Sequence, residues 1–233
     1  MKIKIPAFLF KKGNVIRIGP KKPPVQRQPA PEAESPKKQS PMMEEILQEL
    51  QKKPPEVLIE GLKGSDPFIR SISAEVLGRL HEKVSVDALI IALKDPSKHV
   101  REKAAIALGY IGDKRCIPAL IESLTDEIEE VRVTAAGVLG HLHDKVAVPA
   151  LMNALKDPSA ITRMKSAISL GIIRDDIAIA PLYELLKDEN ELVRKYACEA
   201  LGNIGKAAIP ALLLALKDER VRQFAAQVML RIK

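Results

Sequence analysis

The sequence repeats itself at an interval of 31 residues, and this period limits the possible fold more than any other feature of the chain. A period of about 20 to 50 residues is typical of solenoids and other repeat architectures. The chain divides into six units, which begin near residues 57, 88, 119, 150, 181 and 211. Three columns keep strict register, namely Leu62, Leu93, Leu124, Leu155 and Leu186; Arg70, Arg101, Arg132, Arg163 and Arg194; and Gly78, Gly109, Gly140, Gly171 and Gly202.

Each unit has the pattern of two helices joined by a short turn. In the third unit Pro118 opens the first helix, because proline is tolerated at a first helical position. Apolar residues then recur at steps of three and four through the second helix, at Val131, Ala135, Val138, Leu139 and Leu142. We therefore predict an all-α fold, an α–α superhelical solenoid of about six two-helix repeats within residues 42–233.

An aspartate recurs in the turn between the two helices, where its carboxylate can accept hydrogen bonds from helix N–H groups. Each unit also carries an arginine near this aspartate, and a planar guanidinium suits bridging between neighbouring units. The alternative is a set of solvated surface arginines. We predict a ladder between stacked repeats that consists of Arg70, Arg101, Arg132, Arg163 and Arg194 with Asp95, Asp126, Asp157 and Asp188.

The positive charge of the chain is concentrated at its N-terminus. Residues 1–41 carry ten lysines and arginines against two acidic residues, a net charge of +8. Residues 42–233 carry 27 basic and 28 acidic residues, a net charge of −1. A basic chain often binds nucleic acid or another polyanion, and the uneven distribution assigns this possibility to the N-terminal segment rather than to the repeats.

The N-terminal segment also differs from the repeats in composition. Residues 19–41 hold seven of the seventeen prolines, which is typical of an extended, disordered linker. Residues 2–18 have apolar clusters around Gly13-Asn14 and are either a short β-hairpin that docks on a partner or a disordered tail. Residues 42–52 show helical spacing of apolar residues and are expected to form a helix that caps the first repeat.

The repeat resembles a known family. The pattern Asp126…Val131-Arg132…Ala135-Ala136…Leu139-Gly140 is similar to the short HEAT-like repeat named after the phycobilisome bilin lyases, over residues 57–233. That family includes lyase subunits, phycobilisome-degradation factors, a di-iron hydroxylase and many adaptors, so the resemblance implies a superhelix with a concave groove and does not choose an activity. The hydroxylase His-Glu pairs are absent from the corresponding positions, which read Glu102-Lys103, Val133-Thr134, Met164-Lys165 and Lys195-Tyr196.

No constellation in the sequence indicates catalysis. His81 and His143 occupy equivalent loop positions two repeats apart, which favours loop or surface roles over a metal site. Cys116 and Cys198 lie 82 residues apart, outside any metal or redox spacing. The sequence has neither a phosphate-cradling glycine loop nor Gly-x-Ser-x-Gly. We therefore expect no catalytic residue, metal site or cofactor, and no enzymatic activity.

The positions two, five and nine residues after each arginine vary most from unit to unit. Their spacing places them on one face of the second helix, which lines the concave groove in HEAT-like arrays. Tyrosine, arginine and exposed isoleucine are common in protein contacts. The predicted groove residues are Ile72, Arg79, Lys103, Ile106, Tyr110, His141, Lys165, Ile168, Tyr196, Glu199, Asn203, Phe224 and Arg231.

These features lead us to expect a non-enzymatic scaffold or adaptor that binds a protein partner in the concave groove. Two alternatives stay open. The resemblance alone implies an accessory subunit of a bilin lyase-like or cofactor-attachment activity, and the charge of residues 1–41 favours tethering to nucleic acid or anionic lipid. The sequence has neither a membrane-spanning apolar run nor the apolar core of a signal peptide, so we expect a soluble, cytoplasmic protein.

Overall fold

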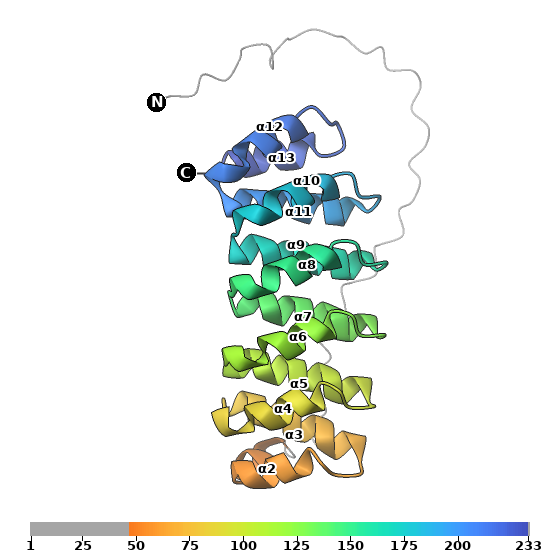
Figure 1. Ribbon diagram of the computed structural model, residues 1–233, viewed down its shortest axis with the longest axis vertical. Coiled ribbons are helices and arrows are strands. Elements are labelled where there is room, and N and C mark those ends of the chain that lie inside the picture. The colour runs from red at the N-terminus through yellow and green to blue at the C-terminus, as the bar shows by residue number, and fades with distance from the viewer. Residues whose placement is uncertain (1–46, 233) are drawn as a thin grey trace, which may run out of the picture. The chain divides into compact units, whose positions relative to one another are not determined.

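The protein is a stack of helix pairs. The computed structural model describes residues 47–232, and Figure 1 shows the pairs following one another along one axis in the order of the sequence. No strand occurs in these residues. The first helices of the six pairs are α2 (Pro55–Gly61), α4 (Val86–Ala92), α6 (Ile117–Ser123), α8 (Val148–Ala154), α10 (Ile179–Leu185) and α12 (Ile209–Ala215). The second helices are α3 (Pro67–Arg79), α5 (Lys98–Ile111), α7 (Glu129–His141), α9 (Ala160–Ile173), α11 (Glu191–Ile204) and α13 (Arg222–Met229).

The chain is therefore the all-α solenoid that its period predicts. One boundary differs slightly from expectation, because α6 begins at Ile117 and places Pro118 at its second position, where a missing N–H is equally harmless. The predicted hairpin at 2–18, the predicted linker and the predicted boundary at residue 41 lie outside the described residues. Residues 47–51 are helical and Leu47 is only 2% exposed, within the stretch expected to cap the first repeat.

The second helices of the first five repeats each end near a residue with positive φ, whereas α13 ends with Leu230 in right-handed geometry. The position is occupied by His81, Gly112, His143, Arg174 and Gly205, all with positive φ. A residue in this conformation ends a helix and turns the chain back, and it costs least when the residue is glycine. The two equivalent histidines thus mark a repeated helix end, and the Nδ1 of His81 also lies 2.7 Å from the carbonyl oxygen of Tyr110 in the next repeat.

Neighbouring second helices pack directly against one another along the stack. The recurring glycines allow this close approach. A Cβ atom added at Gly78 would lie 2.5 Å from the Cα of Ala107, and one added at Gly171 would lie 2.7 Å from the Cα of Ala200. Both distances are too short for a real contact, and the opposing atoms belong to backbone that cannot easily move.

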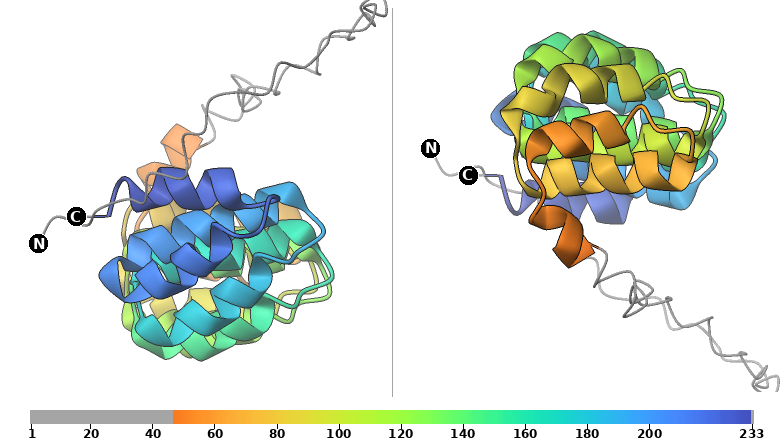
Figure 2. Two further views of the ribbon diagram at one scale, coloured as in Figure 1. Left: turned by 90° about the horizontal axis from the view of Figure 1, so that it is seen from above. Right: turned by 90° about the horizontal axis from the view of Figure 1, so that it is seen from below.

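The spacing of the two helix rows sets the direction in which the stack curves. The second helices approach one another closely, whereas only α10 and α12 make more than isolated contacts among the first helices. The shorter row of a curved stack lies on its inner side, so the second helices form the inner row. Seen along the stack in Figure 2, the helix pairs are progressively rotated rather than eclipsed, which makes the curve superhelical.

The core is built from aliphatic side chains that repeat with the units. Its largest fully buried members are leucines, including Leu77, Leu108 and Leu139 on successive second helices and Leu89, Leu120 and Leu151 on successive first helices. Fully buried alanines such as Ala105 and Ala136 separate the second helices. Small and aliphatic residues suffice because each helix contacts only its neighbours, which explains how the chain forms a core with an aromatic content of only 3%.

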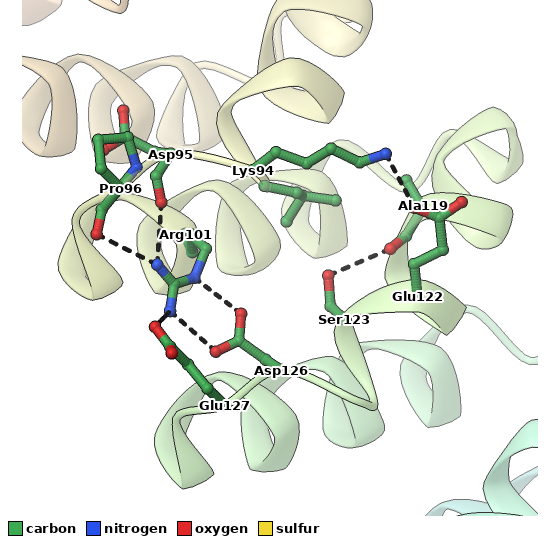
Figure 3. A pocket seen from close by; sticks show the side chains of 10 residues that line it. Lys94, Asp95, Pro96, Arg101, Ala119, Glu122, Ser123, Asp126 and Glu127 are labelled. Atoms are coloured by element: carbon green, nitrogen blue, oxygen red, sulfur yellow. Dashed lines mark hydrogen bonds and ion pairs between the residues drawn. The ribbon is translucent and has the colours of Figure 1, made fainter.

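Arginine–aspartate pairs join neighbouring repeats along one edge of the stack. Each guanidinium makes two roughly parallel bonds to a carboxylate of the next unit, as Figure 3 shows for Arg101 and Asp126. The Nη1 of Arg101 also donates to the carbonyl oxygens of Asp95 and Pro96. The side chains of these pairs are only 8–12% exposed. The Nε–Oδ2 distances are 2.7 Å for Arg70–Asp95, 2.7 Å for Arg101–Asp126, 2.8 Å for Arg132–Asp157 and 2.7 Å for Arg163–Asp188.

The ladder stops at Arg194, which differs from the expectation of a rung in every unit. The four pairs above join residues 25 positions apart, and that position after Arg194 is Glu219 rather than an aspartate. The unit is one residue shorter, so the aspartate falls at Asp218, where it binds Arg220 instead. Arg194 donates only to the carbonyl oxygens of Asp188 and Glu189, and its buried Nε has no partner within residues 47–232.

We expect Gly171→Ala to destabilise the fold by about 1–3 kcal/mol, because the new methyl group would overlap the backbone of Ala200. Urea unfolding followed by circular dichroism measures the effect. Gly137→Ala is the matched control, since its Cβ would meet only the flexible side chain of Lys165 at 3.4 Å. That change should be neutral or stabilise the helix by up to about 1 kcal/mol. Equal effects at both positions would contradict the tight seam between second helices.

We expect Asp95→Asn to lower the free energy of unfolding at neutral pH by about 1.5–3 kcal/mol, because it removes the charge that Arg70 binds. Burial alone raises the pKa of Asp95, but the hydrogen bonds from Arg70 and the Ser97 amide and the nearby positive charges outweigh it, so the pKa is lowered overall. The stabilisation is therefore present above the unfolded pKa of about 4 and is lost as pH falls through the lower folded value.

The difference between wild type and Asp95→Asn should accordingly shrink when urea unfolding is repeated below about pH 4. Glu122→Gln is the control, because Glu122 pairs with Lys94 while both side chains remain more than 60% exposed. An exposed pair contributes at most about 1 kcal/mol. A loss for Asp95→Asn no larger than that of the control would show that the ladder does not stabilise the stack.

Candidate partner-binding face

The accessible side of the second helices forms a continuous strip along the inner row, which we call the inner face. Relative to the repeated arginine of each unit, it consists of the position two residues before and the positions two, five and nine residues after. These positions lie on one side of a helix because they are spaced by three and four residues. In α9 they are Ile161, Lys165, Ile168 and Ile172, all half-buried or exposed. The residues between them, such as Leu170, are buried in the core.

Most of the predicted groove residues lie on this face. Lys103, Ile106, Lys165, Ile168, Tyr196 and Glu199 are half-buried, and Arg79, Tyr110, His141, Asn203 and Arg231 are exposed. Phe224 is half-buried and packs partly against the core, so only part of its ring is accessible. Their recognition role is a proposal, since placement on an accessible face does not identify a contact.

Ile72 is the exception and corrects the predicted set. It is 5% exposed and belongs to the hydrophobic core. Lys103 and Lys165 occupy the same column, but their aliphatic stems lie along the helix while their charged ends remain accessible, and that of Lys103 pairs with Glu75. An isoleucine has no polar end to keep hydrated, so at this position it is buried rather than presented.

The structure adds a column of residues that the sequence analysis missed. Phe68, Ile161 and Leu192 lie two residues before the arginine column and are 46%, 51% and 55% exposed. The signal was present in the sequence, because this column is one helical turn before a groove position. It was overlooked because the pattern was counted forward from the arginines only. These three side chains are the more exposed apolar part of the inner face.

The apolar part of the inner face is concentrated on α9 and α11. Ile161, Ile168 and Ile172 follow one another along α9, and Leu192 and Tyr196 lie on the adjacent α11. Gly137 on α7 has no side chain beside this area, and the stem of Lys165 lies across it. Accessible aliphatic and aromatic side chains grouped in this way are typical of surfaces that contact other proteins.

The charges of the inner face differ between its two ends. Near α3 and α5 they are tightly paired, because Glu75 lies 2.7 Å from Lys103 and 2.6 Å from Arg79, which leaves one net positive charge. Burial alone raises the pKa of Glu75, but these two cations outweigh it and the pKa is lowered. On α11 the pairing is looser, since Lys195 is 3.9 Å from Glu199 and also lies over the ring of Tyr196.

Two cavities open on the surface of the stack. The first, of about 410 Å³, lies between the turns of the second and third repeats and is drawn in Figure 3. Its main cation, Arg101, already binds Asp126, Asp95 and Pro96, so it has little capacity left for a ligand. The second, of about 460 Å³, lies at the C-terminal end of the inner face, between α11 and α13.

The two cysteines are placed for packing. Cys116 and Cys198 are both fully buried free thiols in the core. Burial raises the pKa of Cys116 to about 11 and that of Cys198 to about 12. A thiol becomes a nucleophile or metal ligand only when it is deprotonated. Within residues 47–232 no three histidine, cysteine, aspartate or glutamate side chains gather in a way that could hold a metal ion.

We expect both thiols to resist a disulfide reagent in the folded protein. At pH 8 the raised pKa of Cys116 alone should slow its reaction roughly 100-fold relative to a free thiol, and burial slows it further. Absorbance of the released thiolate measures the reaction, with the chain in denaturant as the control in which both cysteines react. Rapid labelling of the native chain would contradict the buried placement.

The comparisons with known proteins agree with this architecture. A family model described as HEAT repeats matches residues 55–129, 117–191 and 179–233. No curated protein matches the sequence significantly. No helix within residues 47–232 has the length and apolar character needed to cross a bilayer.

Several solved structures share the fold. The complex of CpcE and CpcF of phycocyanin lyase from Nostoc sp. PCC7120 is similar with 27% identity and a TM-score of 0.61, over 89% of this chain and 81% of that chain. An engineered protein matches with 23% identity and a TM-score of 0.55, over 76% of this chain and 96% of that chain. A computationally designed armadillo repeat protein for modular peptide recognition matches with 19% identity and a TM-score of 0.54, over 78% and 100% of the two chains.

Proposed function

This chain belongs to the HEAT-repeat family, and we propose that it is a non-enzymatic scaffold that binds a protein partner along its inner face. The observation that carries the proposal is the group of accessible apolar side chains on α9 and α11, which include Ile161, Ile168 and Tyr196. Aliphatic and aromatic side chains contribute most binding energy when a partner covers them and excludes water.

The rigidity of the stack supports the same function. The close helix contacts at the recurring glycines, such as Gly78 and Gly171, and the Arg–Asp ladder hold successive second helices in fixed register. A contact surface that is already ordered loses little conformational entropy when a partner binds. The inner face also combines apolar residues with Lys103 and Lys165, so it offers both burial and charge recognition.

A second candidate is an accessory subunit of a lyase-like or cofactor-attachment reaction. The observation in its favour is the similarity to the complex of CpcE and CpcF of phycocyanin lyase, at 27% identity. The test is to mix a free bilin with the purified chain and record the bilin absorbance spectrum. A spectral shift that is reversed when a partner protein competes for the bilin would favour this candidate over a general scaffold.

A third proposal concerns residues 1–41, whose charge of +8 suits an anionic partner. It predicts a second contact that weakens steeply with salt and disappears when these residues are deleted. Joined to the repeats through a proline-rich segment, such a contact would raise the effective concentration of a partner at the inner face.

We expect the triple variant Tyr110→Ala, Ile168→Ala and Tyr196→Ala to lose its protein partner while keeping its helicity. The three residues are accessible on the inner face and lie outside the buried core, so their removal should cost binding rather than folding. Tagged full-length chain, residues 42–233 and the variant serve as baits in native lysate, with mass spectrometry as the readout and circular dichroism as the test of folding.

The matched control is Ile91→Ala with Leu213→Ala, which removes exposed apolar side chains from the first helices. A protein retained by the first two baits and the control, but lost by the inner-face variant, supports the scaffold. A protein retained equally by the inner-face variant would refute binding along this face. A protein lost only when residues 1–41 are removed would move the contact to the N-terminal segment.

A further inference from the structure

Two arginines near the C-terminal end of the inner face are not engaged with any other described residue. Arg174 and Arg231 make neither an ion pair nor a side-chain hydrogen bond within residues 47–232. Every other arginine in that range donates to a carboxylate or carbonyl oxygen, namely Arg70, Arg79, Arg101, Arg115, Arg132, Arg163, Arg194, Arg220 and Arg222. The two exceptions stand out because every other arginine of residues 47–232 binds an oxygen within that part of the chain.

Both exceptions line the same cavity. The cavity of about 460 Å³ between α11 and α13 has Arg174 and Arg231 in its wall, together with Asn203 and Glu199. Its apolar wall comes from Val228 and Ile232. Arg174 and Arg231 are 57 residues apart in the sequence, so the stacking of the repeats brings them to one site.

The residue at position 174 also differs from its counterpart in the next repeat. Its φ of 59° is left-handed, and the equivalent residue is glycine two repeats before (Gly112) and one repeat after (Gly205), but histidine one repeat before (His143). Glycine adopts this conformation without strain, whereas a long side chain costs of the order of 1 kcal/mol. His81 and His143 adopt the same conformation, so a side chain is tolerated at this helix end, and at Arg174 it brings a guanidinium to the wall of the cavity.

The charge balance of the cavity fits one negative charge. Among the residues that line the cavity, Arg174 and Arg231 contribute two positive charges and Glu199 one negative charge, which leaves +1. Lys195 is not part of this lining and pairs with Glu199 at 3.9 Å from outside it. A guanidinium binds a carboxylate through two parallel N–H donors, and the amide of Asn203 can donate a further bond. A phosphate dianion has the same oxygen chemistry, but Glu199 would repel its second charge.

We propose that this cavity binds a single carboxylate of a partner protein, held by Arg174 and Arg231 beside an aliphatic residue that packs on Val228 and Ile232. The proposal rests on the proposed function, since it names one recognition element of the partner bound along the inner face. Ile172 and Tyr196 on the same helices extend the apolar surface from the cavity toward the middle of the stack. The partner segment is therefore acidic and aliphatic. Residues 1–41 of this chain, with a charge of +8, have the wrong sign.

A phage library of twelve-residue peptides, selected on the full-length chain, tests the proposal. We expect the selected peptides to share an aspartate, glutamate or free C-terminal carboxylate next to leucine, isoleucine or valine. Synthetic peptides with the recovered sequence are then titrated by fluorescence anisotropy. Arg174→Gly and Arg231→Gln should each weaken binding roughly 10-fold or more. Arg174→Gly should also fold at least as well as the wild type, because glycine occupies the equivalent positions in two other repeats.

The control variant is Arg115→Gln, which removes the same charge from an exposed site where Arg115 pairs with Asp113. It should bind as the wild type does. Replacing the peptide carboxylate by an amide should weaken binding to the wild type at least as much as either substitution does. It should have little further effect on the double variant Arg174→Gly with Arg231→Gln, since one contact is lost only once. A phosphoserine peptide that binds more tightly than the carboxylate peptide would overturn the assignment of the anion.

The two proposals can fail separately. If the selected peptides bind normally to Arg174→Gly and Arg231→Gln but lose affinity for the variant Ile168→Ala with Tyr196→Ala, the carboxylate site is refuted and the inner face remains the contact. If the selected peptides bind all of these variants equally, or if the library yields no binder, both the carboxylate site and binding along the inner face are refuted.

Discussion

The close approach of neighbouring second helices governs the geometry of the whole stack. Gly78 and Gly171 lie against backbone atoms of the next helix, at distances that leave no room for a Cβ. The first helices have no such seam along most of the stack. This inequality makes the second helices the shorter, inner row. It therefore decides which helix face is offered on the inner side and which faces are buried in the core.

The Arg–Asp ladder acts on the same interface from its edge. Each guanidinium binds the carboxylate of the next unit and two carbonyl oxygens of its own turn, as Arg101 does. One guanidinium group thus satisfies two carbonyl oxygens in the turn of its own repeat and fixes the distance between that repeat and the next. The missing rung at Arg194 shows how strictly this depends on spacing, because a single-residue deletion moves the aspartate out of reach and leaves it bound to Arg220.

These two constraints leave the inner face free to vary without loss of fold. Glu75, Ile106 and Gly137 occupy one column in successive repeats although their chemistry differs completely. The face is tightly ion-paired near α3, apolar at α9, and basic around Arg174 and Arg231. A partner bound along the inner face would therefore contact regions of different chemistry on one rigid support. In this way repeat arrays combine a common fold with recognition that is specific to each protein.

The sequence by itself determined the fold, because the 31-residue period repeats the apolar spacing and a turn aspartate in every unit and a glycine in the first five. It also determined the arginine and aspartate columns that meet along the edge. Only the tertiary structure decided that Ile72 is buried while Lys103 in the same column is accessible, and that Phe68, Ile161 and Leu192 belong to the inner face. It also placed Arg174 and Arg231 around one cavity. The period specifies the contacts within each unit and between adjacent units. Which side chains are accessible, and which distant side chains meet at one site, depends on how far each repeat is rotated against the next. That rotation is set by the packing of the helices.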